Sequence, residues 1–181
     1  MTVHIKLIEK RICKRRLYKG SAVNFNVDTI RLPNGKAATR EYLDHPGAVA
    51  VLPVLENGDI VLVRQYRYPI EEVTWEIPAG KMHGRGDNPL KRAAAELAEE
   101  TGYRGRLKKM LDFWPCCTFS NERLHIYSCT DMRRGSSCPD EDEFLCVKSV
   151  PFAKAFAMVK SGAIRDAKTV IALLAWQCKY K

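Results

Sequence analysis

The sequence predicts an α+β fold in which a mixed sheet lies between helices and a small antiparallel sheet precedes it. Three features indicate this fold: short strand-like runs separated by turn signals, one strong helix near the middle of the chain, and two amphipathic segments at its end. With 181 residues, 46% of them hydrophobic and 28% charged, the chain is long enough for a full core. We expect an N-terminal β-sheet region over residues 1–45 and a main domain over residues 46–181.

Antiparallel strands are expected along the N-terminal region. Apolar side chains alternate loosely with polar ones over residues 3–43, beginning with Val3, Ile5 and Leu7. The runs TIRLP and ATREYL flank Asn34-Gly35, a strong hairpin signal because both residue types tolerate a positive φ angle. This region is therefore predicted to form the small sheet.

The main domain is predicted to begin with a buried strand and a second hairpin. Residues 48–55 form the longest apolar run of the chain, and its length suits a strand. Asn57-Gly58 is the next turn signal, after which Ile60–Gln65 returns as a second strand. Glu72–Ile77 is expected to be short and extended.

The strongest helix signal follows a glycine-rich loop. The stretch LKRAAAELAEET has high helix propensity, Pro89 stands near its start, and Gly102 is placed to cap its end. The remaining predicted elements are strands at Leu124–Cys129 and Phe144–Val150 and helices at Phe152–Ser161 and Ala167–Gln177.

Charge and cysteine content limit the class of protein. The net charge is +9, with much of the excess in Lys10–Lys19 and Arg104–Lys109, and it fits nucleic acid, a polyanionic small molecule or a solvated face. No apolar run reaches the ~18 residues of a membrane helix, and the N-terminus lacks the apolar core of a signal peptide. The seven cysteines form an irregular set without a CxxC pair, which favours reduced thiols. We therefore expect a soluble cytoplasmic protein with no membrane partner.

Three glutamates on the predicted helix are candidate metal ligands. Glu96, Glu99 and Glu100 are spaced i, i+3 and i+4, so they project from one side of the helix. Their like charges repel one another, which invites a cation, and Mg²⁺ takes carboxylate oxygens while keeping waters that a phosphate can replace. Taken alone, such a pattern is more often a solvated acidic face.

The surrounding segment reads GKMHGRGDNPLKRAAAELAEETG from Gly80 onward. It resembles the box of the Nudix hydrolases: G, five residues, E, seven residues, RE, an aliphatic residue, any residue, EE, any residue, G. Here Asp87 replaces the first acid, the loop before it is one residue longer, and Ala95 replaces the arginine that pairs with the glutamates in the family. Losing that arginine is expected to loosen the site and reduce activity. Arg92, four residues before Glu96, is a candidate substitute, although an ordinary surface arginine is the favoured interpretation.

Six blocks carry a more specific resemblance. In order they are HPGAVAVLPV, LVRQYRYP, WEIPAGK, FSNE, PDEDEF and GAIRDAKTVIALL, and the match extends over residues 20–177. They are similar to the ADP-ribose pyrophosphatase group of nucleoside-diphosphate-sugar hydrolases. The resemblance implies a Nudix fold, which is an α/β/α sandwich. It also implies metal-dependent hydrolysis of the pyrophosphate bond of ADP-ribose or a related nucleoside diphosphate sugar, giving a nucleoside monophosphate and a sugar phosphate.

The resemblance further implies roles for individual residues. Mg²⁺, with Mn²⁺ as the alternative, would be held by Ala79 through its carbonyl oxygen and by Glu96, Glu99 and Glu100. The general base would lie in the acidic run after the box, where Glu143 is favoured over Glu141. Glu99 completes the expected catalytic set.

The resemblance also implies substrate contacts and an oligomeric state. The expected substrate-binding residues are Arg40, Arg64, Arg67 and Glu76. Guanidinium forks match phosphate oxygens, although Arg64 and Arg67 could equally pair with surface acids. The N-terminal strands imply a homodimer, and the expected partner is a small nucleotide sugar rather than nucleic acid.

Two alternative functions remain open at this level. A Nudix enzyme acting on dinucleoside polyphosphates or capped RNA would fit the net positive charge, but the six blocks argue against it. A weakly active nucleotide-binding module would fit the departures at Asp87 and Ala95.

Overall fold

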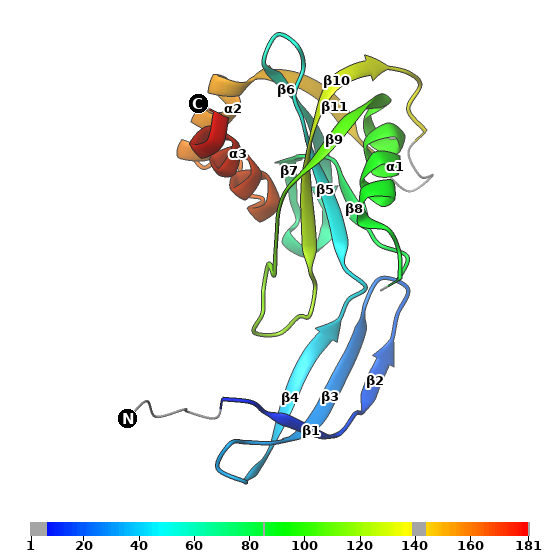
Figure 1. Ribbon diagram of the computed structural model, residues 1–181, viewed down its shortest axis with the longest axis vertical. Coiled ribbons are helices and arrows are strands. Elements are labelled where there is room, and N and C mark those ends of the chain that lie inside the picture. Colours follow the sequence, from blue (N-terminus) through cyan, green and yellow to red (C-terminus); the bar gives the residue numbers. More distant parts are fainter. Residues whose placement is uncertain (1–6, 85, 139–143, 181) are drawn as a thin grey trace. The chain divides into compact units, whose positions relative to one another are not determined.

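The computed structural model describes residues 7–84, 86–138 and 144–180, and the chain divides into two compact units (Figure 1). The first unit consists of Met1–Pro46 and Cys116–Glu122, and the second of Gly47–Pro115 and Arg123–Lys181. A short segment from the second half of the sequence thus joins the N-terminal residues in one unit.

The first unit is a four-stranded antiparallel sheet centred on β3. The strands are β1 (Lys10–Cys13), β2 (Arg16–Lys19), β3 (Asn24–Arg31) and β4 (Ala37–Asp44). β4 pairs along one edge of β3, and the short strands β1 and β2 pair along the other. Gly35, with φ of 86°, forms the turn between β3 and β4, and the N–H of Leu32 donates to the carbonyl of Lys36 at 2.8 Å. The predicted hairpin is confirmed.

Among the described residues, the first strands, β1 and β2, lie in the basic segment. Leu7 is not part of a strand, and the earlier positions lie outside the described residues. Lys14 and Arg16 approach a carboxylate oxygen of Asp44 at 3.3 and 3.4 Å, and Asp28 accepts the N–H of Arg15 at 3.4 Å. Ion pairs and backbone hydrogen bonds hold β1 and β2, which apolar alternation did not predict.

The second unit contains two sheets. The first has the order β8–β5–β10–β9, in which β5 and β10 run parallel and the other pairs are antiparallel. The second sheet, β11–β6–β7, is antiparallel. The strands are β5 (Ala48–Pro53), β6 (Asp59–Arg67), β7 (Glu72–Glu76), β8 (Ala79–Lys81), β9 (Tyr103–Phe113), β10 (Leu124–Arg134) and β11 (Cys146–Pro151). A mixed sheet was predicted, and the first sheet confirms it.

Helices cover both faces of the mixed sheet, and β5 shows why. The helical elements are η1 (Tyr68–Ile70), α1 (Pro89–Thr101), α2 (Phe152–Lys160) and α3 (Ala167–Tyr180). Val49 and Val51 pack in a cluster with Leu97 of α1, whereas Ala50 and Leu52 pack in the cluster under α2 and α3. Alternate residues of a strand point to opposite faces, and Figure 1 shows α1 on one side of β5 and β10, with α2 and α3 on the other. This is the predicted α/β/α sandwich.

Helix α1 begins and ends where the sequence predicts. The side chain of Asn88 accepts the N–H groups of Leu90 and Lys91 at 3.0 and 3.1 Å, while Pro89 has no N–H to satisfy. Gly102, with φ of 75°, ends the helix in the left-handed conformation that favours glycine. Both ends are fixed, which holds the glutamates of this helix in place.

The second basic segment belongs to a strand that was not predicted. Arg104–Lys109 lies in β9, which pairs with β10 at the edge of the mixed sheet and keeps most of its charged side chains exposed. Charged residues on an edge strand prevent further pairing, so no apolar alternation is required. β10 also extends past the predicted end at Cys129 to Arg134.

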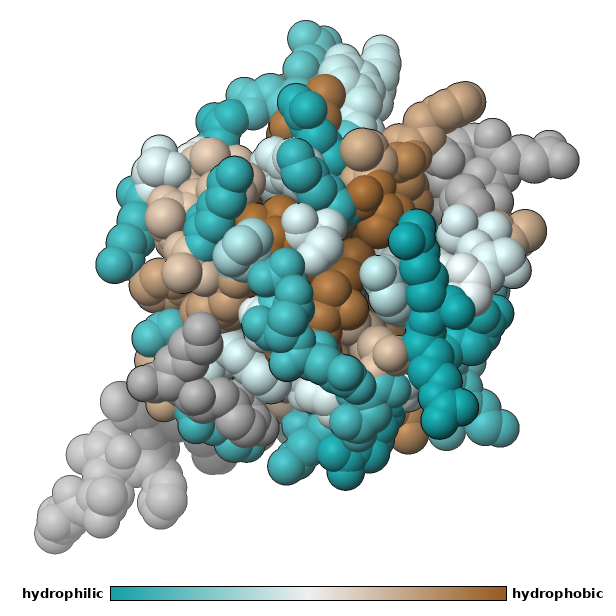
Figure 2. Space-filling model, turned by 90° about the horizontal axis from the view of Figure 1, so that it is seen from above, coloured by the Kyte–Doolittle hydropathy of each residue, from teal (hydrophilic) through white to brown (hydrophobic). Residues whose placement is uncertain are grey.

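The visible surface agrees with an ordinary globular composition. Figure 2 shows hydrophilic side chains spread among hydrophobic ones on the face seen from above. Among the described residues, no helix combines the length and the apolar character needed to span a membrane.

Candidate active site

The three glutamates of α1 differ in exposure. Glu96 and Glu100 are buried, with 4% and 3% of their surface exposed, whereas 42% of the side chain of Glu99 is exposed. Glu96 and Glu100 are four residues apart, which places them on the same face of the helix. Buried carboxylates are costly unless cations or hydrogen-bond donors surround them. The groups that surround these two define the site.

Strand β8 lies directly against this face of α1. The N–H of Ala79 donates to Oε2 of Glu100 at 3.3 Å. A Cβ atom added at Gly80 would lie 1.5 Å from Oε1 of Glu96, so a larger residue would displace that carboxylate. Glycine at this position therefore allows the close approach of helix and strand. The structure brings together three of the four predicted metal ligands: Ala79, Glu96 and Glu100.

Arg92 engages two of the glutamates from within the same helix. Its Nη2 lies 2.5 Å from Oε1 of Glu96, and its Nη1 lies 3.6 Å from Oε2 of Glu99. Its Nε donates to the backbone carbonyl of Lys81 at 3.3 Å, and 17% of the side chain is exposed. The interpretation of Arg92 as an ordinary surface arginine is therefore wrong, because such a residue keeps its guanidinium in water.

The carboxylate oxygens of Glu96 and Glu100 suit a hard divalent cation. Carboxylate oxygens are the ligands that Mg²⁺ and Mn²⁺ prefer, and two of these carboxylates are withdrawn from bulk water. Within the described part of the chain, no three His, Cys, Asp or Glu side chains form a ready-made metal cluster. Oε1 of Glu96 contacts Arg92 and Oε2 of Glu100 accepts the N–H of Ala79, so groups of the chain itself hold both carboxylates in place.

A further buried carboxylate, Glu76 at the end of β7, lies among fixed donors and is 1% exposed. Nε and Nη2 of Arg67 donate to its two oxygens at 2.8 and 2.7 Å. The hydroxyl of Thr74 donates to Oε1 at 2.5 Å, and the ammonium of Lys168 donates to Oε2. Burial raises the pKa of Glu76, but the donors from Arg67, Lys168 and Thr74 outweigh it and lower the pKa from 4.5 to about 2. Glu76 is therefore ionised at neutral pH.

Lys168 reaches Glu76 from the first turn of α3. Its Nζ lies 3.0 Å from Oδ1 of Asp166, whose Oδ2 accepts both the N–H and the hydroxyl of Thr169 at 3.0 and 2.5 Å. Oγ1 of Thr169 in turn accepts the N–H of Ile77 at 2.9 Å, which ties α3 to the end of β7. Sequence reasoning assigned no role to Lys168 or Asp166, because Lys168 and Glu76 are 92 positions apart. The block GAIRDAKTVIALL was the available signal.

A cavity of about 560 Å³ opens beside the Glu76 network. Its size suits a small organic ligand. Arg67 uses Nε and Nη2 on Glu76, so its Nη1 has no hydrogen bond with other described residues. The residues that line the cavity combine charges of both signs with apolar surface: Arg67, Pro69, Ile70, Glu72, Thr74, Glu76, Arg165, Asp166 and Lys168.

The two other predicted substrate contacts have different surroundings. Arg64 on β6 is exposed, and its guanidinium carbon lies 5.4 Å from the centroid of the Trp75 ring. Arg40 lies on β4 of the first unit, where its Nε donates to Glu9 at 3.0 Å. Arg64 therefore stacks on an aromatic ring rather than joining the Glu76 network.

The predicted general base falls in a segment that the structure does not describe. Glu141 and Glu143 both lie outside the described residues. The chain that leads to them is attached to α1, because the N–H of Cys138 donates to the carbonyl of Glu99 at 3.0 Å.

Known proteins resemble this chain over nearly its whole length. The profile of the NUDIX domain matches residues 44–173. ADP-ribose pyrophosphatase from Bacillus subtilis is 40% identical and aligns with 96% of this chain and 95% of its own length. Methanol dehydrogenase activator from Bacillus methanolicus is 38% identical over 91% of this chain and 90% of its own.

The fold also has a close structural relative. A crystal structure of an ADP compounds hydrolase superposes with a TM-score of 0.80, covering 93% of this chain and 92% of the other. The two chains share 18% identity, so this likeness concerns the fold alone.

Proposed function

The chain belongs to the NUDIX family and is a pyrophosphohydrolase of that family, and we propose that it hydrolyses the pyrophosphate bond of ADP-ribose or a related nucleoside diphosphate sugar. The products are a nucleoside monophosphate and a sugar phosphate. The observation that carries this proposal is the 40% identity to an ADP-ribose pyrophosphatase over 96% of the chain. A match of that extent includes both α1 with its glutamates and the Glu76 network.

The residues that would hold a metal are Ala79, through its carbonyl oxygen, and Glu96, Glu99 and Glu100. Mg²⁺, with Mn²⁺ as the alternative, would supply charge neutralisation at the phosphates and a more acidic water there. The burial of Glu96 and Glu100, at 4% and 3% exposed, supports this assignment because such carboxylates favour a neutralising cation.

A carboxylate in the acidic run after Cys138 takes the proton of the attacking water. Glu143 is the first candidate and Glu141 the second. The hydrogen bond from the N–H of Cys138 to the carbonyl of Glu99 supports this role, because Cys138, two positions before the acidic run in the sequence, is held at α1.

The substrate occupies the cavity beside Glu76. Arg67 is the best-placed phosphate ligand, because Glu76 holds its guanidinium by two hydrogen bonds and Nη1 remains for a phosphate oxygen. Glu76 is saturated by donors, so it acts on the substrate by orienting Arg67. Arg64 and Arg40 are further substrate contacts.

The protein forms a homodimer in the cytoplasm. The edge strands of the first unit expose large apolar side chains: Ile12, Leu17 and Tyr18 are 51%, 50% and 63% exposed. All seven cysteines are free thiols, which supports a reducing compartment. Light scattering at micromolar concentration should give twice the mass of the chain, and a monomer would contradict the dimer.

Turnover by the purified protein tests the proposed reaction. ADP-ribose, GDP-mannose, a dinucleoside polyphosphate and capped RNA are incubated with Mg²⁺, and a phosphatase converts the products to measurable phosphate. We expect ADP-ribose or another nucleoside diphosphate sugar to be the preferred substrate. Preference for capped RNA or a dinucleoside polyphosphate would favour that branch of the family, and ligand binding without turnover of any compound would contradict the enzyme.

A second candidate function follows from the 38% identity to methanol dehydrogenase activator. In that case the chain increases the turnover of an alcohol dehydrogenase. Adding the protein with Mg²⁺ to such a dehydrogenase tests this candidate, and an unchanged rate of alcohol oxidation would exclude it for that enzyme.

A further inference from the structure

We infer that Arg92 is a positioning residue, which orients and neutralises Glu96 and Glu99 in place of the arginine missing at Ala95. The inference rests on the proposed function, because it concerns the carboxylates assigned to metal binding. It adds a role for a residue outside the conserved letters of the Nudix box. It also explains how the acidic cluster of this chain is held without the usual arginine.

The contacts of Arg92 join the parts of the site that need a fixed geometry. One guanidinium contacts Glu96 at 2.5 Å and Glu99 at 3.6 Å, and its Nε donates to the carbonyl of Lys81 at 3.3 Å. Lys81 is the last residue of β8, which also carries Ala79. The planar donors of arginine suit this task, whereas a lysine ammonium lacks the fixed fork. Arg92 therefore fixes two carboxylates relative to the strand beside them.

Helix stability alone gives a poor account of this arrangement. Arg92 precedes Glu96 by four residues, and a cation placed before an acid is the less favourable order on a helix. The side chain is 17% exposed, so the guanidinium also gives up much of its hydration. An ion pair of this order and burial is better explained by its effect on Glu96 than by its effect on α1.

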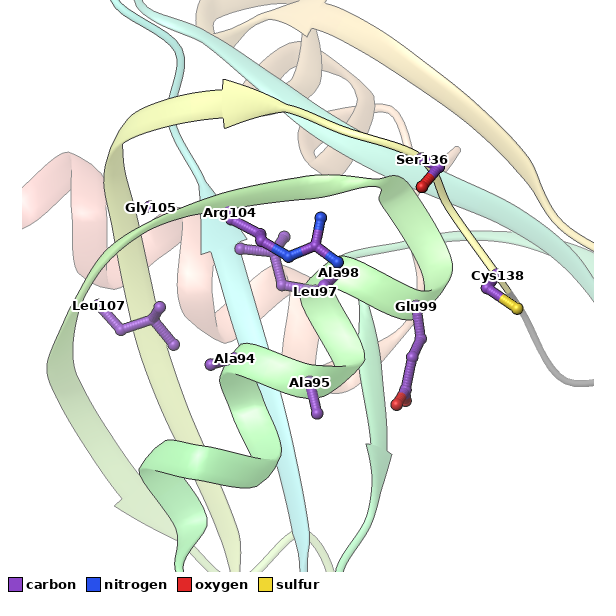
Figure 3. Close-up of a pocket in the computed structure, with 10 residues that line it drawn as sticks. All are labelled: Ala94, Ala95, Leu97, Ala98, Glu99, Arg104, Gly105, Leu107, Ser136 and Cys138. Carbon is purple, nitrogen blue, oxygen red and sulfur yellow. The ribbon is translucent and has the colours of Figure 1, made fainter.

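The space around Ala95 offers a direct way to test the substitution. Ala95 lines a cavity of about 470 Å³ together with Glu99, and Figure 3 shows both side chains extending the same way from α1. Position 95 precedes Glu99 by four residues, just as Arg92 precedes Glu96. An arginine placed at 95 therefore has room and can approach the acidic cluster from the neighbouring turn.

The experiment compares Arg92→Ala with the double variant Arg92→Ala/Ala95→Arg, which moves the arginine to the family position. Arg92→Lys tests the need for a planar fork, and Lys91→Ala removes an exposed cation from the same turn as the control. Mn²⁺ affinity is measured by titration without substrate, kcat and KM are measured with ADP-ribose, and thermal melts are recorded without metal. Should Arg92→Ala fail to fold, Arg92→Lys provides the comparison with wild type.

We expect Arg92→Ala to lose about 10–100-fold in Mn²⁺ affinity or in kcat, which is typical of outer-shell partners of metal ligands. KM should change much less, Arg92→Lys should be intermediate, and Lys91→Ala should match wild type. The double variant should recover most of the loss. Wild-type Mn²⁺ affinity and kcat in Arg92→Ala would overturn the inference, and so would a double variant no better than Arg92→Ala. Absent turnover by wild type would count against the proposed function, while the Mn²⁺ titration would still decide the role of Arg92.

Discussion

The buried carboxylates of the second unit are neutralised in two different ways. Glu76 is surrounded by side chains from three separate elements: Arg67 of β6, Thr74 of β7 and Lys168 of α3. Glu96 instead faces an arginine of its own helix, and Glu100 accepts a backbone N–H from β8. Donors from several elements fix a carboxylate as part of a scaffold. Carboxylates on one helical face can converge on a metal, so burial alone does not identify a metal ligand.

Removing the charge of Glu76 should have the largest effect, and it should be on stability. Glu76→Gln leaves Lys168 and the more exposed Arg67, whose side chains are 13% and 42% exposed, without their anion, so we expect a loss of about 3 kcal/mol in the free energy of unfolding. Urea denaturation measures the change. Glu72→Gln breaks the more exposed pair with Arg165 and serves as the control, with a loss below about 1 kcal/mol. Equal losses of unfolding free energy in the two variants would show that the buried Glu76 network stabilises the fold no more than the exposed pair of Glu72 and Arg165.

Removing the charge of Glu100 should lower the catalytic rate and leave the stability nearly unchanged. Glu100→Gln deletes a proposed metal ligand, and we expect kcat to fall by roughly 10²–10³-fold. The free energy of unfolding should stay within about 1 kcal/mol of wild type, because the amide oxygen can still accept the N–H of Ala79. Steady-state assays with ADP-ribose and urea denaturation measure the two quantities. An unchanged kcat would refute the assignment of Glu100.

Acid should weaken the scaffold through Glu76. Its pKa is lowered from 4.5 to about 2 in the folded protein, so its contribution to stability is complete above pH 4.5 and disappears as the pH falls through 2. We expect a loss of about 2 kcal/mol between pH 5 and pH 3 from this group. Urea denaturation at several pH values in this range gives the free energy of unfolding as a function of pH. This free energy should fall less steeply with decreasing pH in Glu76→Gln than in wild type, and an equal fall would show that Glu76 is not the responsible group.

A methyl group at position 80 should disturb the site at the lowest cost in stability. In Gly80→Ala the new Cβ collides with the carboxylate of Glu96, which is the mobile end of a side chain and can move away. We expect kcat to fall about tenfold, with little change in the melting temperature. Gly84→Ala is the control, because a Cβ there meets no atom within 4 Å. If both variants keep wild-type kcat, the position of Glu96 does not limit the reaction.

The sequence was sufficient where the physical cause is local. Asn88, Pro89 and Gly102 set the ends of α1 through contacts within a few residues, and the apolar run of β5 reflects its burial on both faces. The spacing of Glu96 and Glu100 likewise placed them on one face of α1. These features follow from local backbone geometry, so the residue types and their spacing in the sequence are enough to predict them.

Other features depend on contacts between distant residues or on burial. Glu76 and Lys168 form an ion pair although they are 92 positions apart, and a periodic sequence pattern cannot predict a contact of that separation. The helical pattern placed Arg92 near Glu96 but could not tell that β8 covers its guanidinium. β9 was missed because the charged side chains of an edge strand hide its alternation.

Direct metal titration is the simplest test of whether the glutamate face of α1 binds the metal. Mn²⁺ binding, measured without substrate and competed with Mg²⁺, is compared between the wild-type protein and Glu100→Gln. We expect wild type to bind the metal and Glu100→Gln to bind it at least about tenfold more weakly. Equal affinity in the two proteins, both folded, would contradict the account of α1 as the metal-binding face.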